Sequence, residues 1–237
     1  MGCCASNIEQ PPLPKIELLE EEKKIQQQEK TMLFFDKYSK EVELQLKSKS
    51  TKDKLSTPQL RRVAFHLKID SSVFQDPSKP EFKFLNLFRS EGSLYDVSVL
   101  SLYGIMIGQG TVEEKASILF DHFDADASGM MNKEEIRQML EKMIEISVDK
   151  VPQITIIQNV LTEEAKESYV KLLLSAKESF IGNLTEKITG EGEEINLEGF
   201  INKIKASEDL KNILWAKGMR TALFYEAKKL SSSSVTN

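Results

Sequence analysis

A twelve-residue stretch near the middle of the chain carries oxygen-bearing side chains at alternating positions. It runs from Asp124 to Glu135 and offers carboxylates, a hydroxyl and an amide. Such oxygens are the ligands of a hard divalent cation, and a glycine at the sixth position allows the positive φ that a tight turn needs. The expected metal ligands are Asp124, Asp126, Ser128, Met130 through its carbonyl, Asn132 through a water molecule, and Glu135 through both carboxylate oxygens.

This donor set predicts calcium as the cofactor. Calcium accepts flexible coordination by seven oxygens at about 2.4 Å, whereas magnesium prefers a tighter octahedron and would be a competitor. A zinc site is not predicted, because His122 beside the stretch and His66 elsewhere have no partner ligands in the pattern.

The segments on both sides of the stretch have helical periodicity. Apolar residues recur at helical spacing before and after it, which predicts a helix, a loop and a second helix. The alternative is an acidic surface turn between two helices. The residues concerned are Ala116, Leu119, Phe120 and Phe123 before the loop, and Ile136, Met139, Leu140 and Met143 after it.

The apolar spacing that follows the loop recurs elsewhere, which indicates four repeats. Each copy is preceded by an aliphatic residue that we expect in a small two-stranded contact between paired loops: Leu55, Leu94, Met131 and Ile195. The longer last interval predicts an insertion within Val148 to Thr162.

Three of the four repeats lack the ligands for a metal. In the first, Gln59 takes the closing position. The second, Arg89 to Ser98, is two residues short and has no acid at its start. The fourth, Thr185 to Gly199, is acidic but has glycine in place of the closing glutamate. One ion per chain is therefore expected.

The first six residues, Met-Gly-Cys-Cys-Ala-Ser, fit the pattern for N-myristoylation. Gly2 is the predicted acyl acceptor. One myristoyl chain anchors only weakly, and the segment from Glu9 to Lys30 has more acids than lysines, so the second signal is predicted to be thioacylation of Cys3 and Cys4.

The composition limits the classes of protein to which the chain could belong. The 237 residues are 40% hydrophobic and 29% charged, with a formal net charge of −5. That charge argues against nucleic-acid binding, and no apolar run is long enough to span a bilayer. With no cysteines besides the adjacent pair, the chain is expected to be intracellular. One helix is expected from Lys15 to Lys47, with a solvated first half.

With these residues in view, the chain resembles the EF-hand superfamily, in particular the neuronal calcium sensor and calcineurin B group. The matching phrases are 110–115, 120–126 and 206–214. The resemblance implies an all-α fold of four EF-hand-like helix-loop-helix units in two paired lobes, with short two-stranded inter-loop contacts. The implied parts are an acylated N-terminus (1–14), a non-binding pair (15–110), a pair with one calcium loop (111–215), and a C-terminal helix with a Ser-rich tail (216–237).

The function expected from this resemblance is a membrane-tethered calcium sensor or adaptor whose partner is a protein target helix. The alternative is a calcineurin B-like regulatory subunit of a phosphatase or kinase with structural calcium. The paired cysteines resemble those of dually acylated calcium-binding proteins of protist membranes. The expected location is the cytoplasmic face of a membrane, either the plasma membrane or a ciliary or flagellar one.

No enzyme motif stands out, so neither catalytic residues nor a small-molecule substrate are expected. Two features of the sequence are relevant to binding of the protein target helix. Met130, Met131, Met139 and Met143 crowd the loop, with core positions favoured for the last two. The apolar C-terminal segments 213–215 and 222–225 could fill a groove of the chain itself or grip a partner.

Overall fold

The computed structural model describes residues 17–90 and 94–233, and helices make up most of them. The α-helices are α1 (Glu20–Glu29), α2 (Ser39–Lys49), α3 (Thr57–His66), α4 (Pro80–Leu85), α5 (Val97–Ile107), α6 (Val112–Phe123), α7 (Lys133–Ile144), α8 (Gln153–Ile157), α9 (Glu163–Leu174), α10 (Lys177–Thr189), α11 (Leu197–Ala206), α12 (Glu208–Asn212) and α13 (Ala216–Ser233). Short 3-10 helices are η1 (Ser71–Phe74) and η2 (Asn86–Phe88), and η4 (Glu145–Lys150) is a π-helix that continues α7.

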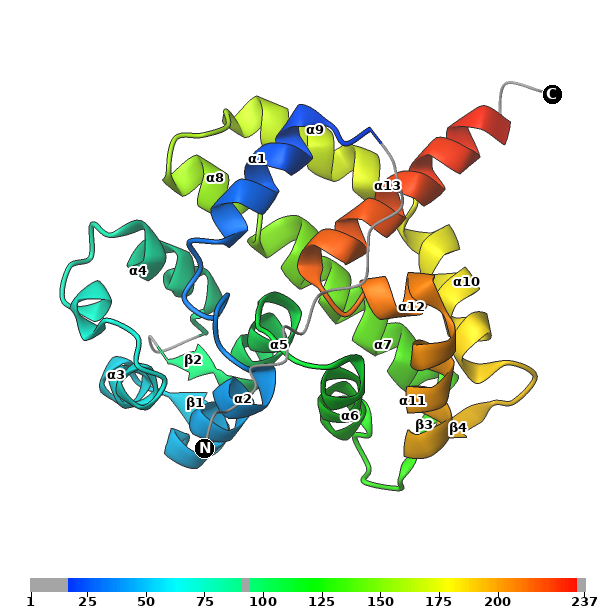
Figure 1. Cartoon of the computed structure of the whole chain (residues 1–237), viewed down its shortest axis with the longest axis horizontal. Coiled ribbons are helices and arrows are strands. Elements are labelled where there is room, and N and C mark those ends of the chain that lie inside the picture. Colours follow the sequence, from blue (N-terminus) through cyan, green and yellow to red (C-terminus); the bar gives the residue numbers. More distant parts are fainter. Residues whose placement is uncertain (1–16, 91–93, 234–237) are drawn as a thin grey trace, which may run out of the picture.

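The strands form two small antiparallel sheets on opposite sides of α5 and α6 (Figure 1). In one, β3 (Met130–Asn132) pairs with β4 (Glu194–Asn196), and Met131 lies opposite Ile195 as predicted. In the other, β1 (Lys54–Leu55) pairs with β2 (Tyr95–Asp96). Here the prediction was wrong by one residue, because Leu55 lies opposite Tyr95 and Leu94 precedes the strand. The expectation of a mainly helical fold with short two-stranded contacts agrees with this architecture.

Each strand ends where a polar residue begins the next helix. Asp96, Asn132 and Asn196 accept a hydrogen bond from the backbone N–H three residues on, at 3.3, 3.0 and 2.8 Å. These side chains satisfy N–H groups that a helix start otherwise leaves unpaired. The start of α3 has a capping box, in which the Gln59 Oε1 accepts from the Ser56 N–H at 2.8 Å.

The helix predicted from Lys15 to Lys47 is two helices. Residues 30–38 turn instead, because their backbone pairs with the end of α5: Ser39 N–H donates to the Gln109 carbonyl at 2.8 Å, and Gln109 N–H donates to that of Lys37 at 2.7 Å. Tertiary pairing thus overrides local helix propensity. The expected solvation of the first half was also wrong, since Glu22, Ile25 and Glu29 form a buried face of α1.

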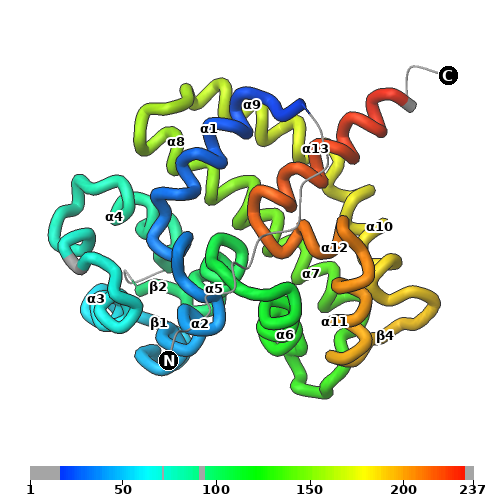
Figure 2. Tube along the Cα trace, viewed as in Figure 1, coloured from blue at the N-terminus to red at the C-terminus, as the bar shows by residue number. Residues whose placement is uncertain are grey.

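The predicted insertion is longer than Val148 to Thr162. It comprises the end of η4, α8 and the whole of α9, and therefore extends to Leu174. α9 contacts both α1 and α13, and α8 contacts α1 and α4. Figure 2 shows α1, α8 and α9 together above α5, and the contact between α8 and α4 joins the insertion to the N-terminal part of the fold.

A buried ion-pair network joins the two ends of the described chain. The Arg220 guanidinium on α13 donates to both oxygens of Glu22 at 2.8 and 2.9 Å and lies 2.7 Å from Glu29 Oε1. It also donates to the Ser147 carbonyl in η4 at 3.2 Å, and the Tyr169 hydroxyl donates to Glu22 at 2.5 Å. This network fixes α1 and α13 against η4 and α9.

The C-terminal apolar segments pack inside the chain's own fold. Ile213, Leu214, Trp215, Leu223 and Phe224 are buried, while Tyr225 is exposed. Beside them, the buried Lys115 of α6 donates to the Ile105 carbonyl at 2.6 Å, and its Nζ lies 4.2 Å from the centre of the Trp215 ring. Burial lowers the pKa of Lys115. Among the described helices, none has the length and apolarity needed to cross a bilayer.

Replacing Glu29 with glutamine is expected to stabilise the protein increasingly as the pH rises. Burial raises the pKa of Glu29 from its ordinary 4.5, and the negative charge of the neighbouring Glu22 adds to this shift against the opposing effect of Arg220. The folded state therefore binds this proton more tightly than the unfolded chain, so the associated stability is present below about pH 4.5 and is lost as the pH rises through the folded pKa. Urea unfolding over a pH series measures the effect.

The matched control is Glu167→Gln, which changes an exposed carboxylate of α9. The difference between the two variants isolates the contribution of the buried Glu29 carboxyl group. A Glu29→Gln effect of the same size at all pH values would contradict the assignment of a shifted carboxyl group.

Candidate metal site

The predicted metal-binding stretch forms the loop between α6 and β3. Asp124 follows the last residue of α6, and its N–H donates to the Phe120 carbonyl at 2.9 Å. The chain then reverses through two residues with positive φ, Ala127 at 54° and Gly129 at 77°. No atom lies within 4 Å of a Cβ added at Gly129, so glycine serves the backbone angle there and not the available space.

Backbone N–H groups orient the first carboxylate of the loop. Asp124 accepts from the Ser128 N–H at 3.0 Å with one oxygen and from the Gly129 N–H at 2.9 Å with the other. Asp126 accepts from the same Ser128 N–H at 3.1 Å. Hydrogen bonds from Ser128, first from its hydroxyl and then from its N–H, lower the pKa of Asp126. Its carboxylate is therefore ionised at neutral pH.

The last residue of the stretch reaches back to its beginning. Glu135 lies in the first turn of α7, where its Oε2 accepts from the Asn132 N–H at 2.9 Å. Its other oxygen, Oε1, accepts from the Ala125 N–H at 3.1 Å. Asn132 reciprocates by accepting from the Glu135 N–H at 3.0 Å. This reciprocal cap fixes the Glu135 carboxylate next to the end of α6.

The result is a cluster of oxygens on a surface loop. One carboxylate oxygen from each of Asp124, Asp126 and Glu135 lies within 4.8 Å of the others. The Ser128 hydroxyl lies 3.3 Å from Asp124 Oδ1 and donates to the Met130 carbonyl at 3.0 Å. Negative charges on carboxylates at this spacing repel one another, and a divalent cation between them would offset that repulsion. The donors are all hard oxygens, which fits calcium.

Most of the predicted ligands come together. Asp124, Asp126, Ser128, Met130 and Glu135 share the cluster described above. The Asn132 side-chain oxygen caps α7, and its predicted contact through a water molecule stays a prediction. The predicted acylation residues Gly2, Cys3 and Cys4 lie outside the described residues. Within residues 17–90 and 94–233, no second group of three or more acidic, histidine or cysteine side chains has this spacing.

The strand pairing identifies the residue equivalent to Glu135 in each of the other three loops. It is the third residue after the helix-capping position, namely Gln59, Val99 and Gly199. None is a carboxylate. In the first loop, the Gln59 amide instead donates to the Lys49 carbonyl at 2.8 Å and to the Thr51 hydroxyl at 3.2 Å. A neutral side chain therefore closes that loop by hydrogen bonding.

In the acidic fourth loop, one carboxylate is paired with a lysine outside the loop. Glu193 forms an ion pair with Lys133 at 2.7 Å, across the β3–β4 contact. At the closing position, Asn196 caps α11 through the Gly199 N–H, and glycine has no side chain to coordinate a cation. The expectation of one metal ion per chain stays a prediction.

Sequence reasoning missed one part of this frame. Tyr95, and not Leu94, is the strand residue of the second unit. The available signal was the capping residue Asp96, because each paired strand residue directly precedes a cap: Leu55 before Ser56, Met131 before Asn132, and Ile195 before Asn196.

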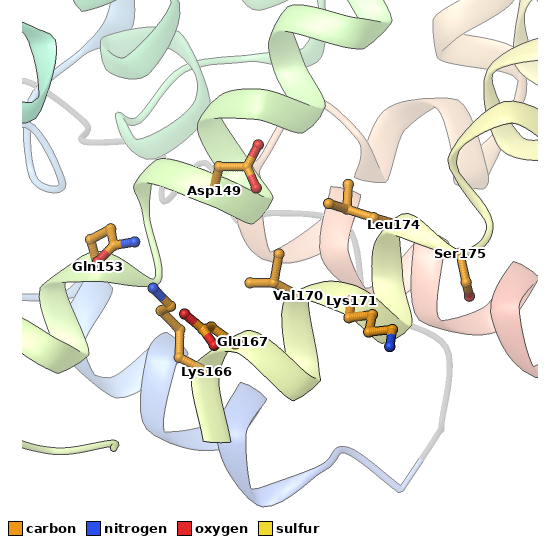
Figure 3. Close-up of a pocket in the computed structure, with 8 residues that line it drawn as sticks. All are labelled: Asp149, Gln153, Lys166, Glu167, Val170, Lys171, Leu174 and Ser175. Atoms are coloured by element: carbon orange, nitrogen blue, oxygen red, sulfur yellow. The ribbon is translucent and has the colours of Figure 1, made fainter. Parts of the chain in front are cut away.

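A separate cleft of about 540 Å³ lies between η4 and α9, away from the metal loop. Figure 3 shows Val170 and Leu174 of α9 along it, with Asp149 on η4 across the space. Lys166 at one end is ion-paired with Glu163. The cleft is mostly apolar and contributes no donor to the carboxylate cluster.

No protein-family model matches the chain, and no curated protein matches its sequence. The geometry of the loop is therefore the basis for the functional proposal below.

Replacing Glu135 with glutamine is expected to weaken calcium binding roughly tenfold or more, because a charged two-oxygen ligand becomes a neutral one. Calorimetric titration of calcium into both proteins measures the change. Glu134→Gln is the matched control, since Glu134 is exposed, bonds to Gln138 and lies outside the cluster. Identical titrations for the wild type and Glu135→Gln would show that this loop is not the binding site.

Proposed function

We propose that the protein is a membrane-tethered EF-hand calcium-binding adaptor with one working loop. The observation that carries the proposal is the convergence of Asp124, Asp126 and Glu135 on a loop that joins two helices and pairs with a second loop through β3 and β4. The two strand pairs support an arrangement of four helix-loop-helix units in two lobes. Calcium is the proposed cofactor, and magnesium is the competitor.

The residues of the loop belong to both flanking helices. Asp124 follows the end of α6 and Glu135 lies in the first turn of α7, so one cation held by both would tie these helix ends together. A calcium-responsive switch further requires that the ligands hold the ion more tightly in one arrangement of α7 than in another. The proposed partner of the responsive state is an apolar helix of a target protein.

A second candidate is a regulatory subunit in which calcium is structural. It is favoured by the burial of the apolar surface near the loop: Met131, Met139 and Met143 are at most 1% exposed. The C-terminal segment likewise fills its own fold, and α7 is continuous with η4, which Arg220 contacts. A target helix could bind here only if this packing changed.

Dye binding distinguishes the two candidates. For an adaptor that responds to calcium, we expect the fluorescence of a hydrophobic-surface dye to rise reversibly with calcium and to fall with chelator. The Glu135→Gln protein should show no such change. If the fluorescence is the same in calcium and chelator while calorimetry detects binding, the structural role is the correct one.

The membrane anchor is the part of the proposal that depends on Gly2, Cys3 and Cys4. Myristate on Gly2 and thioacylation of the cysteines would hold the chain at the cytoplasmic face of a membrane. Gly2→Ala is expected to move the protein into the soluble fraction of cells. Ala5→Gly, which keeps the acceptor glycine, should leave the distribution unchanged. Membrane retention of Gly2→Ala would contradict anchoring by acylation.

A further inference from the structure

The outer face of α3 combines cations with an exposed aromatic ring. Its residues, Pro58, Arg61, Arg62, Phe65 and His66, are all exposed and follow helical spacing. Phe65 is 75% exposed, the highest value among the large hydrophobic side chains of the described residues. Lys68, directly after the helix, is exposed as well. We call this set, with Lys68, the α3 face.

The charge around the α3 face is opposite to that of the whole chain. Residues 39–68 contain eight lysines and arginines against three acidic residues, although the chain has a formal net charge of −5. Arg61 donates to the Phe74 carbonyl at 2.6 Å, but the side chains of Arg62 and Lys68 have no ion pair or hydrogen bond within the described residues. Two cationic side chains without an ion pair, Arg62 and Lys68, thus lie on the same short segment as the exposed Phe65 ring.

We infer that the α3 face binds an anionic lipid surface. Cations attract the negative headgroups, and an aromatic side chain enters the boundary between headgroups and acyl chains. Phe65 has no apolar neighbour among the exposed residues of α3, so it offers a single point of insertion and no groove for a partner helix. Figure 1 places α3 at the edge of the molecule, away from β3 and β4, where a flat surface can reach it.

This inference rests on the proposed membrane attachment and adds to it. Acylation alone does not orient the chain, whereas the α3 face would turn one side of the molecule toward the bilayer. The calcium loop, on the other side of α5 and α6, would then remain accessible from solution. The basic second signal that is missing near the N-terminus would be supplied by the folded chain.

The test uses the full-length, non-acylated protein and vesicles, with chelator throughout. Because calcium and acyl chains are absent, failure of the proposed function cannot affect the outcome. We expect binding to vesicles of phosphatidylcholine with about one third phosphatidylserine, weakened by salt, and little binding to phosphatidylcholine alone. The double variant Arg62→Gln/Lys68→Gln should bind roughly 20-fold more weakly, since each cation near the surface contributes about a fivefold factor.

Matched variants separate the α3 face from nonspecific charge and apolarity. Lys171→Gln/Lys203→Gln neutralises two exposed lysines of α9 and α11 and should bind as the wild type does. Phe65→Ala should weaken binding several-fold, whereas Tyr225→Ala, which removes an exposed aromatic ring of α13, should not. Thermal unfolding confirms that each variant is folded.

Three results would overturn the inference. They are the absence of binding to the anionic vesicles at low salt, equal binding to neutral and anionic vesicles, and an equal loss in the α3 and control variants. Absence of binding at low salt would leave an acidic protein as the remaining occupant to test on this face.

Discussion

The buried guanidinium of Arg220 is the interaction on which the arrangement of the helices depends. It lies on the last helix, yet its partners are on the first helix and on the π-helix that continues α7. Removing it would leave two carboxylates buried without their counter-charge, at a cost of about 3–5 kcal/mol. The Ser147 carbonyl in the π-helix is free to accept from Arg220, because the Val151 N–H donates to the Ile146 carbonyl and Pro152, five residues after Ser147, has no N–H.

The second constraint is a frame repeated four times: a short paired strand, a capping residue and a helix start. The side chain at the closing position differs from loop to loop, and its chemistry bears on what each loop can bind. Glutamine closes one loop by neutral hydrogen bonds, valine and glycine provide no ligand, and Glu135 places a carboxylate oxygen in a cluster with Asp124 and Asp126. The proposed metal site is therefore one variant of a structural element that folds in the same way in all four places.

Local patterns predicted well what local interactions determine. The spacing from Asp124 to Glu135 identified the cluster, and the flanking periodicity identified α6, α7 and the pairing of Met131 with Ile195. The predictions were wrong where contacts with distant segments determine the local structure. The helix expected over 15–47 is interrupted because Gln109 pairs with the backbone at Lys37 and Ser39. Glu22, which we expected to be solvated, is buried against Arg220, a partner 198 residues further along the chain. The spacing of apolar residues within one helix does not show which distant segment that helix will contact.

A direct count of bound calcium tests the central claim, that one loop of this fold holds one divalent ion. Native mass spectrometry of the intact chain with excess calcium provides that count. The account predicts a single calcium ion per chain, displaced by chelator. A metal-free mass under the same conditions, or a stoichiometry of two or more specific ions, would contradict it.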